Sequence, residues 1–157
     1  MIENKTIIAP ATASGRGGIS VIRMSGPQSE VIAQKMCGQL ADPWRFKRCE
    51  IRSGEDSIID SCMVVFFKSP HSYTGDDVIE FHCHGNPTIV NLVLETALKL
   101  GAVVAEPGEF TKTAFLNDKI DLAQAESVAD LINAQSESAV IAANSSLSGK
   151  FSDVINN

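Results

Sequence analysis

The sequence lacks any apolar run long enough to cross a bilayer. Its longest runs, such as residues 62–67, are far shorter than the roughly 20 residues that a membrane-spanning helix needs. The opening residues, Met1–Lys5, contain no apolar segment of the kind found in signal peptides. We therefore expect a soluble, cytoplasmic protein with no membrane partner.

The sequence also lacks the paired C-x-x-C spacing of redox and zinc motifs. Its cysteines stand apart and mostly lie in or beside apolar runs: Cys37, Cys49, Cys62 and Cys83. Reduced thiols are the usual state of such residues inside the cell. We expect no disulfides.

Positive charge is scarce. The chain has 13 Lys and Arg against 19 Asp and Glu, which gives a formal net charge of −6. Because non-specific affinity for nucleic acid comes from clustered cations, this balance argues against a broad phosphate-binding face. If RNA is a partner, most of its contacts should lie elsewhere.

The 157 residues suffice for one domain, or for one domain with an appended piece. In the first part, β-branched runs predict strands at 6–9 and 19–24, joined by a glycine-rich loop. A helix should follow, with Pro27 as its first residue and Gly38 at its end. Its expected inward positions are Val31, Ile32 and Met36.

The middle of the chain predicts two strands. Residues 39–57 are polar and turn-rich, whereas the β-branched and aromatic content of 58–67 favours a buried strand. After an exposed loop at 69–77, residues 78–84 alternate in polarity. The alternation places Ile79, Phe81 and Cys83 on one face and Glu80, His82 and His84 on the other.

Helices dominate the remainder. Asn86 and Pro87 predict the start of a helix that Gly101 ends. A short strand at 102–105 should come next, followed by a turn at 106–109 that leads into a helix through Phe115 and Leu116. A further helix should begin at Asp121, which forms a capping pair with Gln124, with Leu122, Ala125, Ala129 and Ile132 on its buried side. Another should begin near Ser136, with apolar positions at Val140, Ala143, Leu147, Phe151 and Val154. The pattern indicates an α+β fold, a mixed sheet covered by helices, followed by an all-helical segment.

Two arginines are candidate ligand contacts. Arg16 lies among glycines in Gly15–Gly18, where the backbone can approach a ligand closely, although a solvated turn explains it equally well. Arg23 interrupts an apolar strand, so it needs either a partner or an exposed position on a half-buried strand.

Glu80, His82 and His84 form an E-x-H-x-H array on one strand face. Alternate side chains of a strand can hold a metal ion, but three ligands on one strand rarely converge without help from another element. The array fits a metal centre, a polar ligand site or a merely solvated face. Lys119, between two expected helices, resembles a solvated lysine at a helix end when taken alone.

The stretch from Glu106 to Glu126 is the densest signal in the chain. Together with Gly15–Gly18 and with His84 and Gly85, it resembles the N-terminal region of the tRNA uridine-modification GTPases of the MnmE or TrmE family. Asn86 departs from this pattern, because the family commonly has a second Gly there, and Asp76 replaces a more frequent Glu.

The resemblance implies a fold and a ligand. The family's N-terminal domain is similar to the folate-binding domain of the glycine-cleavage T-protein, and it binds 5-formyl- or 5,10-methylene-tetrahydrofolate. Its folate contacts fall here on Arg23, Glu80 and Lys119. A carboxylate suits the donor edge of a pterin, and cations suit the ligand's carboxylates. The expected division is a folate-binding domain at 1–119 and the first helices of a helical domain at 120–157.

The resemblance also implies partners. The family forms homodimers and works with the flavoprotein MnmG on the wobble uridine of tRNA, producing 5-carboxymethylaminomethyluridine, and its GTPase domain binds GTP, magnesium and potassium. This sequence contains no G-x-x-x-x-G-K-[ST] loop, so we expect no GTP hydrolysis by this chain. Alternatives from the residues alone are a metal-dependent hydrolase using Glu80, His82 and His84, or a non-catalytic oligomerisation module.

Overall fold

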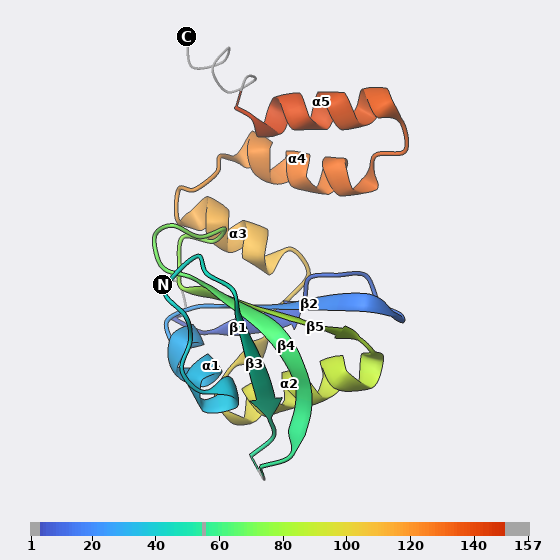
Figure 1. Ribbon diagram of the computed structural model, residues 1–157. Coiled ribbons are helices and arrows are strands. Elements are labelled where there is room, and N and C mark those ends of the chain that lie inside the picture. The colour runs from blue at the N-terminus through green and yellow to red at the C-terminus, as the bar shows by residue number, and fades with distance from the viewer. Residues whose placement is uncertain (1–3, 55, 150–157) are drawn as a thin grey trace. The chain divides into compact units, whose positions relative to one another are not determined.

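The computed structural model describes residues 4–54 and 56–149, which form one mixed sheet and a set of helices (Figure 1). The α+β class expected from the sequence is confirmed. The strands are β1 (Ile7–Pro10), β2 (Gly17–Ser25), β3 (Lys47–Arg52), β4 (Ile58–Phe67), β5 (Val78–Gly85) and β6 (Val103–Val104). The helices are α1 (Ser29–Cys37), α2 (Pro87–Lys99), α3 (Glu109–Leu116), α4 (Leu122–Asn133) and α5 (Glu137–Leu147).

The chain divides into two compact units. The first comprises Met1–Ser72 and Asp76–Pro107, and the second comprises Tyr73–Gly75 and Gly108–Asn157. The whole sheet, α1 and α2 therefore belong to the first unit. The second unit consists of α3 to α5 with a short segment contributed by the loop before β5.

The strand order of the sheet is β3-β4-β5-β2-β1-β6. Neighbouring strands run antiparallel, except that β6 pairs in parallel with β1. Strand β2 lies near the centre, between β1 and β5. This order sets residues of β2 directly against residues of β5. Arg23, for example, lies opposite Glu80, although 57 positions separate them in the chain.

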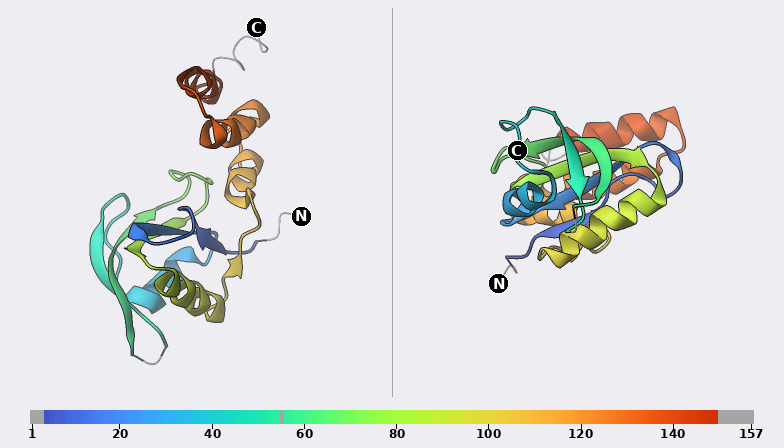
Figure 2. Two further views of the ribbon diagram at one scale, coloured as in Figure 1. Left: turned by 90° about the vertical axis from the view of Figure 1, so that its right-hand side faces the viewer. Right: turned by 60° about the horizontal axis from the view of Figure 1, so that its bottom comes forward.

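One face of the sheet is packed by α1 and α2, which lie on the same side of it (Figure 2). The expected alternation in β5 is confirmed, because Ile79, Phe81 and Cys83 are buried in the core. Burying such side chains gives the fold its main stabilisation, about 1.5 to 3 kcal/mol for each large aliphatic or aromatic residue. The opposite face, which we call the polar face, carries Glu80 and His82 from the same strand.

The helix ends follow the expected capping chemistry with one correction, and the inward face of α1 needs another. Asn86 caps α2, its side chain accepting from the Thr88 backbone nitrogen at 2.8 Å, and Gly38 ends α1 with φ 78. Pro27, however, precedes α1, which begins at Ser29. Val31 was predicted to face inward and is exposed, because Ala33 fills the inward position beside Ile32.

Strand β3 was not predicted, because residues 39–57 appeared turn-rich. It is a short, heavily charged strand at the edge of the sheet, and only Cys49 and Ile51 point inward. Charged edge strands are common in natural sheets, where they discourage pairing with other chains. The alternation of Cys49 and Ile51 with charged residues was the sequence signal from which this strand could have been predicted.

In the second unit, α4 begins as expected. Asp121 accepts from the Gln124 nitrogen at 2.8 Å while the Gln124 side chain accepts from the Asp121 nitrogen at 2.9 Å, a complete capping box. The predicted buried side of α4 is wrong, since Leu122 and Ile132 are exposed and Ser127 is buried.

Ser136 caps α5, as expected, and Ala143 is its buried residue. Two of the apolar positions predicted for this helix, Phe151 and Val154, lie outside the described residues. Among the residues that the structure describes, no helix has both the length and the apolar character needed to span a membrane.

Candidate functional site

Arg23 and Glu80 form an ion pair on the polar face. They stand directly opposite each other on β2 and β5, and the Arg23 Nε and Nη2 both donate to Glu80 Oε1, at 3.0 and 2.9 Å. The two side chains are 25% and 15% exposed. The charge that interrupts β2 thus has a partner, and the pair is still accessible from solvent.

His82 binds the other oxygen of the same carboxylate. Its Nε2 lies 3.0 Å from Glu80 Oε2 and must carry the hydrogen, because a carboxylate only accepts. The far side of the imidazole meets the Phe46 ring edge-on, with centroids 5.1 Å apart. Glu80 is therefore held at both oxygens, and its carboxylate plane is fixed.

This arrangement limits how Glu80 can receive a ligand. A carboxylate offers about four acceptor positions, and Arg23 and His82 occupy three of them. A ligand with two adjacent N–H donors finds one position open on Oε2. Contact by both donors requires Arg23 or His82 to move aside.

His84 turns to a different carboxylate. Its Nδ1 lies 2.9 Å from Asp60 Oδ1, and its backbone nitrogen donates to Asp60 Oδ2 at 2.9 Å. The His84 side chain is 70% exposed, whereas that of Asp60 is 9% exposed. Sequence reasoning missed Asp60, although a carboxylate in the otherwise apolar start of β4 signals a specific partner.

The E-x-H-x-H array therefore splits between two carboxylates. Within residues 4–54 and 56–149, no three His, Cys, Asp or Glu side chains are grouped so that they could hold a metal ion. The geometry gives no support to the metal-dependent hydrolase that the spacing had left open.

Lys119 belongs to the second unit, so the three site residues expected from the sequence divide between the two units. It follows α3, and its backbone nitrogen donates to the Ala114 carbonyl at 2.9 Å. A Cβ built on Gly75 would lie 3.1 Å from Lys119 Cγ. Gly75, with φ 86, thus leaves room for the aliphatic part of Lys119. The Asn117 side chain stabilises the same contact by donating to the Thr74 carbonyl at 2.8 Å.

The glycine-rich loop meets the end of β5. Gly17 pairs with Gly85, and a Cβ on Gly85 would lie 2.3 Å from the Gly17 carbonyl oxygen. No side chain fits there. The residue after His84 must therefore be a glycine, because only a residue without a side chain lets β2 and β5 approach this closely. Arg16, in the same loop, is exposed.

Cys37, Cys49, Cys62 and Cys83 are free thiols in this structure. Burial raises the pKa of the Cys37 thiol to about 12. The hydrogen bond between the Cys62 thiol and Cys83, together with burial, also raises the pKa of Cys62. Because the thiolate is the reactive form, neither thiol is suited to nucleophilic chemistry at neutral pH.

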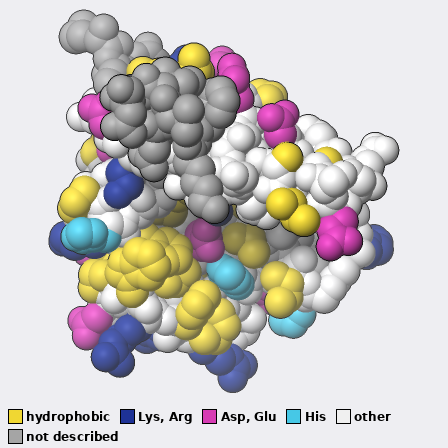
Figure 3. Space-filling view, turned by 90° about the horizontal axis from the view of Figure 1, so that it is seen from above, with side chains coloured by type: hydrophobic (Ala, Val, Ile, Leu, Met, Phe, Trp, Pro, Cys, Tyr) yellow, Lys and Arg dark blue, Asp and Glu magenta, His cyan; other side chains and the backbone are white. Residues whose placement is uncertain are grey.

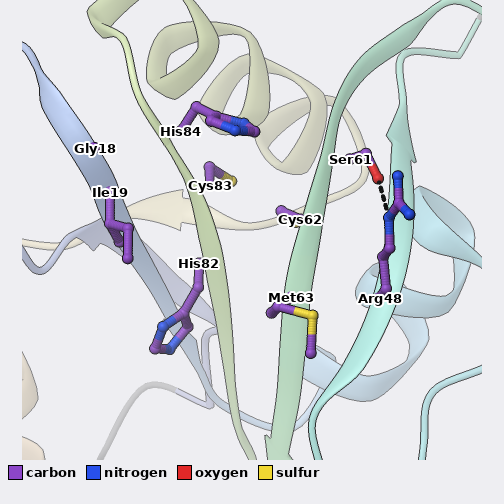
Figure 4. A pocket seen from close by; sticks show the side chains of 9 residues that line it. All are labelled: Gly18, Ile19, Arg48, Ser61, Cys62, Met63, His82, Cys83 and His84. Carbon is purple, nitrogen blue, oxygen red and sulfur yellow. Dashed lines mark hydrogen bonds between the residues drawn. The ribbon is translucent and has the colours of Figure 1, made fainter.

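A hollow of about 240 Å³ opens beside His82, the residue that binds Glu80 (Figure 4). Met63 and His82, which pair in register on β4 and β5, lie at its centre. Arg48 lies at one side, its Nε donating to Ser61 Oγ at 2.9 Å, and Ile19 lies at the other. The hollow thus combines an apolar surface with a cation.

Comparison with known proteins gives a consistent result. Residues 6–119 match the family model described as GTP-binding protein TrmE N-terminus. A tRNA modification GTPase MnmE from Nitrosomonas eutropha is 50% identical over 155 residues, covering 99% of this chain and 34% of that protein. MnmE from Francisella tularensis subsp. tularensis is 50% identical over 157 residues, covering 100% of this chain and 35% of that protein. The chain thus spans about a third of the length of these relatives.

Proposed function

Because the chain belongs to the MnmE/TrmE family of tRNA modification GTPases, we propose that it binds a reduced folate through Arg23, Glu80 and Lys119. The ligand is 5-formyl- or 5,10-methylene-tetrahydrofolate. The single observation that carries this proposal is the Arg23–Glu80 pair, a fixed and partly exposed carboxylate on a sheet face. Glu80 accepts a donor of the pterin edge, and the two cations face the ligand's oxygen atoms.

In the proposed enzyme the folate supplies a one-carbon unit. The target is the wobble uridine of tRNA, where 5-carboxymethylaminomethyluridine forms with the flavoprotein MnmG. The chain also contributes a homodimer interface, and GTP, magnesium and potassium bind to other parts of the protein. The proposed division places the folate-binding domain at 1–119. The end of the family match at residue 119 supports this boundary, although α3 clusters with the helical unit.

Calorimetric titration with 5-formyl-tetrahydrofolate tests the proposal. We expect saturable binding with one ligand per chain. A matched control is Glu95→Gln, which removes an exposed carboxylate from α2, on the other side of the sheet, and should leave the affinity unchanged. Absence of heat and of any ligand-induced change in melting temperature would overturn the proposal.

A further inference from the structure

Arg48 connects two hollows on the first unit. It lines the hollow beside His82 and also a second one of about 440 Å³ at the sheet edge. It belongs to β3, the terminal strand of the sheet, so a ligand chain that crosses the polar face meets Arg48 before it leaves the sheet.

The second hollow is locally cationic on an acidic chain. Four cations line it, Lys35, Lys47, Arg48 and Arg52, against one carboxylate, Glu50. Glu50 is already paired with Arg52, at 2.7 Å. Lys and Arg side chains also line one rim of the face shown in Figure 3. Such a cluster attracts an anionic chain more than a single charge does.

The first hollow suits an aromatic ring. At about 240 Å³ it is smaller than the roughly 300 to 1,000 Å³ of pockets that enclose a whole ligand. It therefore holds one part of a longer molecule. The Met63 thioether and the His82 ring provide the polarisable surface on which a flat ring packs well.

The spacing matches a folate tail. Glu80 and His82 are two residues apart on β5, and His82, Met63 and Arg48 stand in register across three strands. From strand dimensions, the Glu80 and Arg48 backbones are about 12 Å apart. This is comparable with the reach of an extended aminobenzoyl-glutamate group.

We propose that β3 and the end of α1 bind the poly-γ-glutamyl tail of the reduced folate, so that the chain prefers polyglutamylated folates to the monoglutamate. This inference rests on the proposed function. The pterin lies at Glu80, the aminobenzoyl ring over Met63 and His82, and the first carboxylates at Arg48. Each further glutamate adds one α-carboxylate, which meets Lys35 or Lys47.

The test compares 5-formyl-tetrahydrofolate carrying one or five glutamates, by calorimetry on the wild-type chain. We expect the pentaglutamate to bind about tenfold more tightly at low ionic strength, because each exposed ion pair contributes roughly 0.2 to 1 kcal/mol. The advantage should shrink in 0.5 M salt, where the Debye length is only about 4 Å.

Three variants locate the tail. Lys35→Ala, which removes an exposed cation from the second hollow, should reduce the pentaglutamate advantage about threefold, whereas Arg48→Ala should weaken both ligands alike. Lys99→Ala, which removes a cation from the last turn of α2, should leave it unchanged. Equal affinity of the wild type for both ligands would overturn this inference and leave the folate site standing. Failure to bind either ligand would overturn the proposed function as well.

Discussion

The Nε and Nη2 of Arg23 converge on a single oxygen of Glu80, and His82 binds the second oxygen. The carboxylate is therefore oriented before any ligand arrives. Because the side chain is already ordered, less conformational entropy is lost when a ligand binds.

Removing the carboxylate should weaken folate binding. For Glu80→Ala we expect a loss of about 2 to 3 kcal/mol, roughly one and a half to two decades in affinity, because hydrogen bonds to charged groups contribute about that much. Glu80→Gln should be intermediate, since it keeps one acceptor. Calorimetry on folded variants measures the folate affinity of both. Wild-type affinity in Glu80→Ala would show that the folate site does not lie on β5.

His82 should act by orienting Glu80. His82→Gln keeps a donor for Glu80 Oε2 but loses the ring on which the aminobenzoyl group packs, so it should lose less affinity than His82→Ala does. His82→Ala frees the carboxylate and should lose about 1 kcal/mol, or fivefold. The comparison of the two variants in folate titration separates orientation from packing against Phe46. Equal losses in both would contradict the orienting role.

Gly85 should tolerate no side chain. In Gly85→Ala, the new Cβ would lie 2.3 Å from the Gly17 oxygen, and neither backbone segment can yield without disturbing the β2–β5 pairing. We expect a destabilisation of about 3 kcal/mol in urea unfolding. The matched control is Gly18→Ala on β2, whose Cβ meets nothing within 4 Å. If both variants unfold at the same urea concentration, the close approach of Gly85 to Gly17 does not restrict position 85 to glycine.

Alkaline pH should destabilise the fold through Cys37. Burial raises its pKa from 9.0 to about 12, so the folded protein retains the proton that the unfolded chain releases. Stability is therefore complete below pH 9 and falls as pH rises towards 12. Between pH 8 and pH 10.5, wild type should lose on the order of 1 kcal/mol more than Cys37→Ser, which does not titrate there. Identical pH slopes in urea unfolding would exclude this thiol as the cause.

The chain should form a homodimer. The helical unit exposes Leu122, Ile132 and Ile141, and large apolar side chains left exposed to water favour association. Sedimentation in the micromolar range should show a dimer that Ile132→Glu weakens. Val31→Glu on α1, also an exposed apolar position, is the control. A monomer at every concentration would refute dimerisation, and a dimer insensitive to Ile132→Glu would place the interface elsewhere.

Patterns that depend on one element were predictable from the sequence. The alternation in β5 was enough to set Glu80 and His82 on one face and Phe81 in the core. The Asp121 capping box was predictable for the same reason, because all of its partners lie within four residues.

Features that depend on pairing between distant segments were not predictable. The Asp60–His84 contact joins residues 24 positions apart, and the inward face of α4 depends on which helix packs against it. Strand β3 was missed because its charges reflect an edge position, which local composition does not reveal.

The parallel pairing of β1 with β6 has a consequence for synthesis of the protein. Residues 7 and 8 pair with β2 on one edge, but the partners of their other edge, residues 103 and 104, follow only after four other strands and two helices have been made. The β3–β4 hairpin can form as it leaves the ribosome, but β1 must wait with an open edge until β6 emerges. Such long-range closure slows folding, so the nascent N-terminal strand is the segment that most needs protection from pairing with other chains.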